Sequence, residues 1–63
     1  MDLFGLLTIG QDVKVIIYDD EINAVPTHLM TIGTIIGVVN DFYRVDFDGI
    51  VETVEYLKLE AVL

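Results

Sequence analysis

The dipeptide Asp48-Gly49 is the feature that most constrains how this chain folds. It separates two apolar-rich segments, 42–47 and 50–56, and an Asp-Gly pair strongly favours a two-residue hairpin turn because both positions tolerate positive φ. The pair Asn40 and Asp41 suits a second turn of the same kind just upstream. Residues 37–54 are therefore predicted to form a tight antiparallel meander.

Two-residue turns fix the register of the strands that they join, so the pairing of this meander can be predicted. The expected pairs are Val38 with Tyr43, Ile36 with Val45, Phe47 with Ile50, and Tyr43 with Val54. These residues share one face, the core face. The opposite, outer face is expected to hold Ile35, Val39, Phe42 and Val51, interleaved with Arg44, Asp46 and Glu55.

One residue does not suit this register. Glu52 falls opposite Val45 on the apolar face, so either a bulge intervenes or that end of the hairpin lies at the rim of a barrel.

The rest of the chain supplies the remaining elements of an all-β domain. A first strand is predicted over 13–18, and a second over 31–39, where Gly33 and Gly37 indicate a bulge or a bend. Residues 19–30, acidic at their start and containing Pro26, are expected to form a long loop. A helical turn over 57–60 leads to a last strand, 61–63, that pairs with the first. We expect one domain over 1–63, with 1–10 as an apolar lead-in that packs on the domain or on a neighbour.

Composition limits the classes of function. Eleven acidic and three basic residues give a formal charge of −8, although 54% of residues are hydrophobic and the mean hydropathy is +0.65. This charge disfavours direct binding to nucleic acid or to an anionic membrane and favours a partner with a basic surface, while solubility alone explains it equally well. Because the chain has no cysteine, disulfides and thiolate metal sites are excluded, and a cytoplasmic location is the default expectation.

No combination of residues predicts an enzyme. His28 is the single histidine and is expected to be a surface or loop-packing residue, and the threonines have no evident base beside them. The carboxylates of Asp19, Asp20 and Glu21 do not complete the spacing of a calcium loop. We therefore expect no catalytic site, no metal and no cofactor.

The order of the predicted elements resembles the SH3-like barrel. The segments LTIGQDVKVI, GTIIGVV, YRVDFDG and LKLEAV are similar to the pattern of KOW-type domains and of the small SH3-like subunits of photosynthetic and redox complexes, such as the PsaE subunit of photosystem I. The resemblance implies a five-stranded SH3-like barrel with a one-turn helix before the last strand. It implies no function, because the chain lacks the tryptophan of a polyproline-binding groove and the basic charge of RNA-binding KOW domains.

Two functional hypotheses follow. The first is a non-enzymatic interaction or assembly module that docks a protein partner, or a second copy of itself, through the outer face of the meander, with loop 19–30 adding selectivity. Its predicted contact residues are Ile35, Val39, Phe42, Val51, Asp19, Asp20 and Glu21. The second is an acidic inhibitor or nucleic-acid mimic, of the type made by phages and mobile elements, that covers the basic surface of a nucleic-acid-binding protein.

Overall fold

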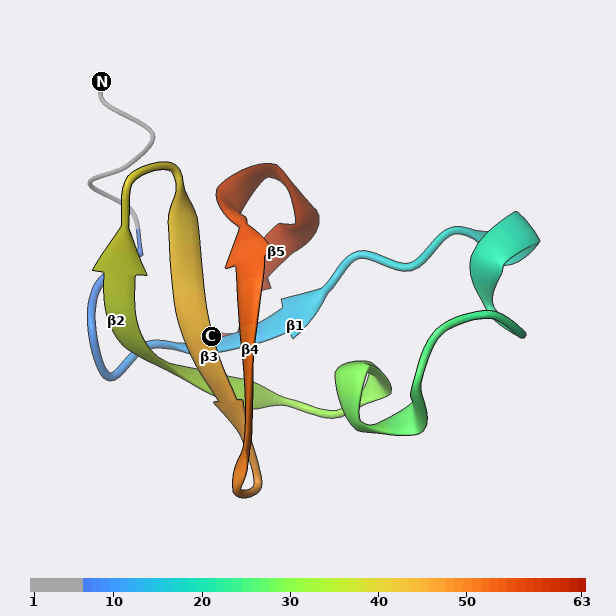
Figure 1. Cartoon of the computed structure of the whole chain (residues 1–63), viewed down its shortest axis with the longest axis horizontal. Coiled ribbons are helices and arrows are strands. Elements are labelled where there is room, and N and C mark those ends of the chain that lie inside the picture. Colours follow the sequence, from blue (N-terminus) through green and yellow to red (C-terminus); the bar gives the residue numbers. More distant parts are fainter. Residues whose placement is uncertain (1–6) are drawn as a thin grey trace.

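A computed structural model describes residues 7–63, which form one five-stranded antiparallel sheet and three short 3-10 helices (Figure 1). The elements in chain order are β1 (Asp12–Val15), η2 (Asp19–Glu21), η3 (Thr27–Met30), β2 (Gly33–Val39), β3 (Phe42–Phe47), β4 (Ile50–Glu55), η4 (Tyr56–Lys58) and β5 (Leu59–Ala61). The strands lie in the order β4-β3-β2-β1-β5. The predicted all-β class is confirmed, and the part of the lead-in at residues 1–6 lies outside the described residues.

The β3–β4 hairpin has the predicted turn and register. Asp48 and Gly49 have φ angles of 54° and 98°, and the Asp46 carboxylate accepts the Gly49 N–H at 2.7 Å. Positive φ at both positions is the type I′ geometry that matches the twist of the flanking strands. Six consecutive pairs follow, from Phe47↔Ile50 to Phe42↔Glu55.

The β2–β3 pairing departs from the prediction because β2 contains a bulge at Ile36. Val38 pairs with Tyr43 as expected, but Val45 pairs with Ile35, and the register shifts between Ile35 and Gly37. An extra residue in one strand reverses the alternation beyond it. The placement of Ile35 on the outer face was therefore wrong: Ile35 is fully buried, whereas Ile36 is 45% exposed.

The core lies on the face of the sheet to which the alternating residues Tyr43, Val45 and Phe47 of β3 belong. Its buried members are Val13, Ile35, Tyr43, Val45, Phe47 and Leu59. Gly33 belongs to this packing through its lack of a side chain, because a Cβ at that position would lie 2.5 Å from Val45 Cγ1 and 2.8 Å from the Phe47 ring. Leu7 packs against the core from the described end of the lead-in.

The first and last strands pair with each other as predicted, but with different limits. β1 ends at Val15 rather than at residue 18, and β5 spans Leu59–Ala61 rather than 61–63. The Ile16 N–H still donates to the Lys58 carbonyl at 2.7 Å, and from there the chain leaves the sheet because η4 gives it no further strand to pair with. Among the described residues, β4 and β5 are the edge strands of the sheet.

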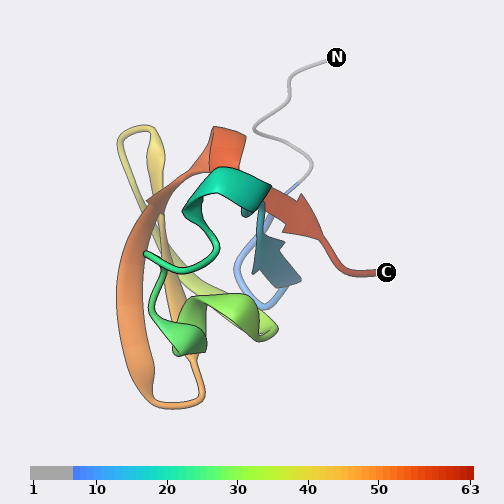
Figure 2. The same ribbon diagram turned by 90° about the vertical axis from the view of Figure 1, so that its right-hand side faces the viewer.

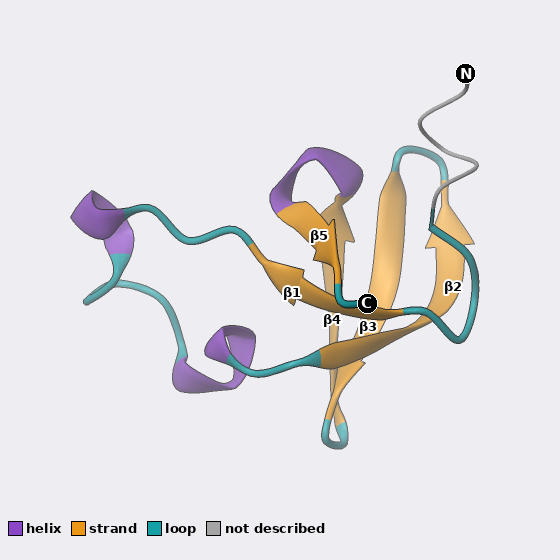
Figure 3. Ribbon diagram, turned by 180° about the vertical axis from the view of Figure 1, so that it is seen from behind, coloured by secondary structure: helices purple, strands orange, loops and turns teal. Residues whose placement is uncertain are grey.

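Residues 16–32, hereafter the arm, connect β1 to β2 and project from the sheet with η2 near the tip and η3 nearer the sheet (Figures 1 and 3). In the view of Figure 2 the arm points towards the reader, with β4 on one side of it and β5 on the other. The predicted long loop thus contains two helical turns, and no arm residue is fully buried.

Candidate functional site

A cleft of about 360 Å³ lies between the arm and β4. This volume is within the usual range for binding sites of small molecules and peptide side chains. Its apolar lining residues are Val15, Ile16, Ile17, Val25, Leu29, Phe42 and Val54, and its polar lining residues are Glu21, Thr53, Glu55 and Lys58. One wall is therefore the edge of a hydrogen-bonded sheet, and the other is the end of β1 together with the arm.

Lys58 and Glu21 attach the arm to η4. Lys58 Nζ lies 3.3 Å from Glu21 Oε1 and 4.8 Å from the centre of the Tyr18 ring. The same Glu21 oxygen accepts the Tyr18 backbone N–H at 3.0 Å, and the Glu21 N–H donates to the Tyr18 carbonyl. The Tyr18 N–H and the Lys58 ammonium together hold the pKa of Glu21 below its ordinary value. Two opposite charges of the cleft lining therefore neutralise each other.

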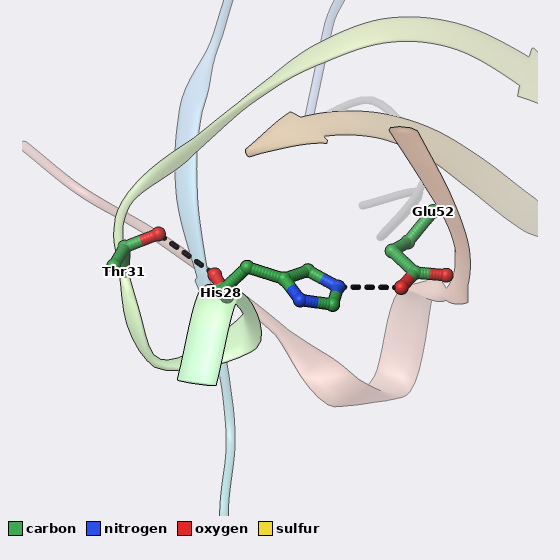
Figure 4. Close-up of polar contacts among 3 residues, drawn as sticks. All are labelled: His28, Thr31 and Glu52. Carbon is green, nitrogen blue, oxygen red and sulfur yellow. Dashed lines mark hydrogen bonds and ion pairs between the residues drawn. The ribbon is translucent and has the colours of Figure 1, made fainter. Parts of the chain in front are cut away.

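His28 attaches the arm to β4 at a second point. His28 Nε2 lies 2.5 Å from Glu52 Oε2, and Thr31 Oγ1 donates to the His28 carbonyl at 2.7 Å (Figure 4). The His28 ring also contacts Phe47 edge-on, with 6.1 Å between ring centres. Glu52 thus occupies the core side of β4 because it has a partner from the arm, which accounts for the residue that did not suit the predicted pattern.

The outer face of the meander is apolar at two places rather than continuously. Val39 and Phe42 pair across β2 and β3 and are 49% and 43% exposed. Val51, 40% exposed, pairs with Asp46 at the other end of the hairpin. Arg44 lies between these two places and covers Gly37, since a Cβ there would be 3.7–4.0 Å from Arg44 side-chain atoms.

Phe42 connects the outer face to the cleft. It belongs to the outer face by its pairing with Val39, and it is also a lining residue of the cleft. We call Val39, Phe42 and the cleft lining the docking surface. Val39 and Phe42 are exposed on the outer face, where the sequence placed them, whereas Ile35, placed there too, is buried.

The three acidic residues predicted at the start of the loop form η2, and they differ from one another. Asp19 and Asp20 are exposed, whereas Glu21 is partly buried and engaged by Lys58 and Tyr18. The arm wall of the cleft was missed at the sequence level. One indication of it was the apolar segment at 15–17, which also suits the continuing strand that was predicted.

Neither a metal centre nor a membrane span is found in the described part of the chain. Within residues 7–63, no three histidine or carboxylate side chains are grouped so that they could hold an ion, and no helix has the length and hydropathy needed to cross a bilayer. The chain matches no protein-family model, no curated protein and no solved structure.

Proposed function

We propose that the chain is a non-enzymatic protein-interaction module whose partner binds the docking surface. The supporting observation is Phe42, an aromatic side chain that is 43% exposed, lies beside an exposed Val39 and lines a mostly apolar cleft. An aromatic residue next to a concave apolar surface is the kind of group that dominates binding energy at protein interfaces. The core does not need the Phe42 side chain, because Tyr43, Val45 and Phe47 fill it from the other face of the sheet.

A partner with a basic contact surface is favoured over a second copy of the chain. Two copies that each have a charge of −8 repel one another, whereas a basic surface is attracted. Self-association, the other form of this hypothesis, is tested by sedimentation across a range of concentrations. A monomer at high micromolar concentration leaves only the heterologous partner.

Phe42→Glu is the variant that tests this proposal, with Ile50→Glu as its matched control. Ile50 is similarly exposed, at 48%, but sits at the opposite end of β4, about 17 Å along the strand from the residue that pairs with Phe42. Both variants should retain the circular dichroism spectrum of the parent. When used as bait in extracts of the native cell, the parent and Ile50→Glu should retain the same protein, and Phe42→Glu should lose it. Equal retention by all three baits contradicts the proposal.

The second candidate function is the acidic inhibitor or nucleic-acid mimic. It is favoured by Asp19 and Asp20 of η2, which are exposed and whose carboxylates have no hydrogen-bond or ion-pair partner within residues 7–63. Changing Asp19 and Asp20 together to asparagine should abolish binding of this kind and affect docking through Phe42 far less, because neither residue lines the cleft. Binding to a basic partner by charge alone should also weaken steeply as salt is raised.

We also propose a cytoplasmic location and an SH3-like architecture for the chain. A cytoplasmic location is supported by the absence of cysteine. The SH3-like resemblance is supported by the strand order and by the helical turn before β5, and it transfers no function to this chain.

A further inference from the structure

The backbone of β4 presents unused hydrogen-bonding groups beside the cleft. In a hairpin with a two-residue turn, the residues that flank the turn exchange both backbone hydrogen bonds, and every second residue then faces the neighbouring strand. Phe47 and Ile50 flank the turn here, so Ile50, Glu52 and Val54 face β3. The N–H and C=O groups of Val51, Thr53 and Glu55 consequently face the open edge, where no strand in the described part of the chain pairs with them.

This open edge coincides with the sheet wall of the cleft. Thr53, Val54 and Glu55 line the cleft on one side, and Val15, Ile16 and Ile17 line it on the other. Two of the three edge residues thus present backbone donors and acceptors directly beside an apolar cavity. An extended segment that adds to a sheet edge obtains its affinity from such backbone groups and its specificity from pockets for alternate side chains.

We propose that the partner inserts an extended segment that pairs with β4 as a sixth strand and alternates apolar with basic side chains. This inference rests on the proposed function and names the kind of partner. Alternate side chains of the added strand point to opposite faces. Those on the Val54 side enter the apolar part of the cleft, and those on the Thr53 side lie along the outer face next to Glu55.

The charge of the docking surface determines which outward side chains of the added strand it favours. Glu21 is neutralised by Lys58, so the lining retains the charge of Glu55, which has no ion-pair partner within residues 7–63. Asp19 and Asp20 next to Glu21 add further negative charge at the tip of the arm. Lysine or arginine at the outward positions complements these carboxylates, whereas acidic residues there would be repelled.

The experiment uses the unmodified chain and a capped nine-residue peptide of alternating valine and lysine as the probe. Two isomers of the peptide have the same side chains and charge, but one is N-methylated at three valines and the other at three lysines. An antiparallel added strand uses the N–H groups of the outward lysines, and a parallel one uses those of the inward valines. In either orientation one isomer loses its pairing hydrogen bonds and the other retains them.

We expect the parent peptide and one isomer to bind within about threefold of each other, and the second isomer to bind at least about tenfold more weakly by isothermal titration calorimetry. Equal affinities of the two isomers, or no binding of the parent peptide at millimolar concentration, overturn the inference. Loss of the cellular partner by Phe42→Glu is scored separately. If that loss occurs while the isomers do not differ, the docking surface stands and strand addition is wrong.

Discussion

The β3–β4 hairpin and the arm are held in place by different interactions. The hairpin has six consecutive backbone pairs and supplies three of the buried core residues, Tyr43, Val45 and Phe47. The arm has no fully buried residue. Its polar attachments to the sheet and to η4 include the backbone bond from Ile16 to Lys58 and the side-chain contacts His28–Glu52 and Glu21–Lys58.

This difference shows that the two walls of the cleft are stabilised in different ways. Its sheet wall has a fixed backbone, because each strand residue is constrained by its pair, whereas its arm wall depends on a few side-chain contacts of modest strength. Stability should therefore reside mainly in the sheet, and adjustment to a partner mainly in the arm. The predictions below test this division, from the largest expected effect to the smallest.

The two adjacent isoleucines of β2 provide the largest contrast. Ile35→Ala removes a fully buried side chain and should lower the free energy of unfolding by about 2–5 kcal/mol. Ile36→Ala alters the exposed bulge residue and should change it by less than about 1 kcal/mol. Urea unfolding of the two variants measures the difference. Equal losses, or a larger loss at Ile36, would show that the bulge is absent.

The turn at Gly49 comes next. Gly49→Val should lower the free energy of unfolding by roughly 1 kcal/mol or more, because a β-branched residue resists the φ of 98°. Gly49→Asn serves as the control, since asparagine tolerates positive φ, and it should cost less. If the valine variant melts at the parent temperature, the hairpin turn lies elsewhere.

The arm contact at Glu52 should have a smaller and more local effect. Glu52→Ala should lower the free energy of unfolding by about 0.5–1.5 kcal/mol, because it leaves the His28 ring without the Glu52 carboxylate as its hydrogen-bond partner. Glu55→Ala on the same strand removes a carboxylate that has no ion-pair partner within residues 7–63. It should change the free energy of unfolding by less than about 0.5 kcal/mol. In the Glu52→Ala variant, amide hydrogen exchange should become faster in the arm but not in β3. Faster exchange throughout the sheet would mean that the arm is not a separate unit.

The smallest effect concerns pH and Glu21. Because the pKa of Glu21 is lower in the folded chain than its ordinary value, the unfolded chain binds more protons as the solution is acidified. The contribution of Glu21 to stability is therefore present above the ordinary glutamate pKa and is lost as the pH falls through the lower, folded value. Glu21→Gln should flatten the acid side of a plot of urea midpoint against pH, while Asp20→Asn should not. If the two variants have the same urea midpoints at acidic pH, the Glu21–Lys58 contact does not hold the arm in place.

The sequence could predict the hairpin because its determinants are local. Asp48-Gly49 and strict alternation fix β3, β4 and their register without reference to the rest of the chain. The bulge at Ile36 could not be placed in the same way, since Gly33 and Gly37 indicated an irregularity but not which residue is inserted. Ile35 was misplaced for this reason.

The candidate site was predicted only where it belongs to the hairpin. Phe42 and Val39 follow from the alternation, whereas the arm wall depends on contacts between residues far apart in the chain, such as His28 with Glu52. A second indication, besides the apolar segment at 15–17, was Glu52, a carboxylate on an apolar face that required a partner from another segment.

The most direct test of the docking surface is amide hydrogen exchange of the chain alone and bound to the protein captured from its native cell. Glu52 and Val54 face β3 and should exchange slowly in both states, whereas Val51, Thr53 and Glu55 face the open edge and should exchange fast in the free chain. We predict that the partner slows exchange at Thr53 and Glu55 and at the arm residues that line the cleft. Slowing confined to η2, with the open edge of β4 unchanged, would contradict docking at this surface.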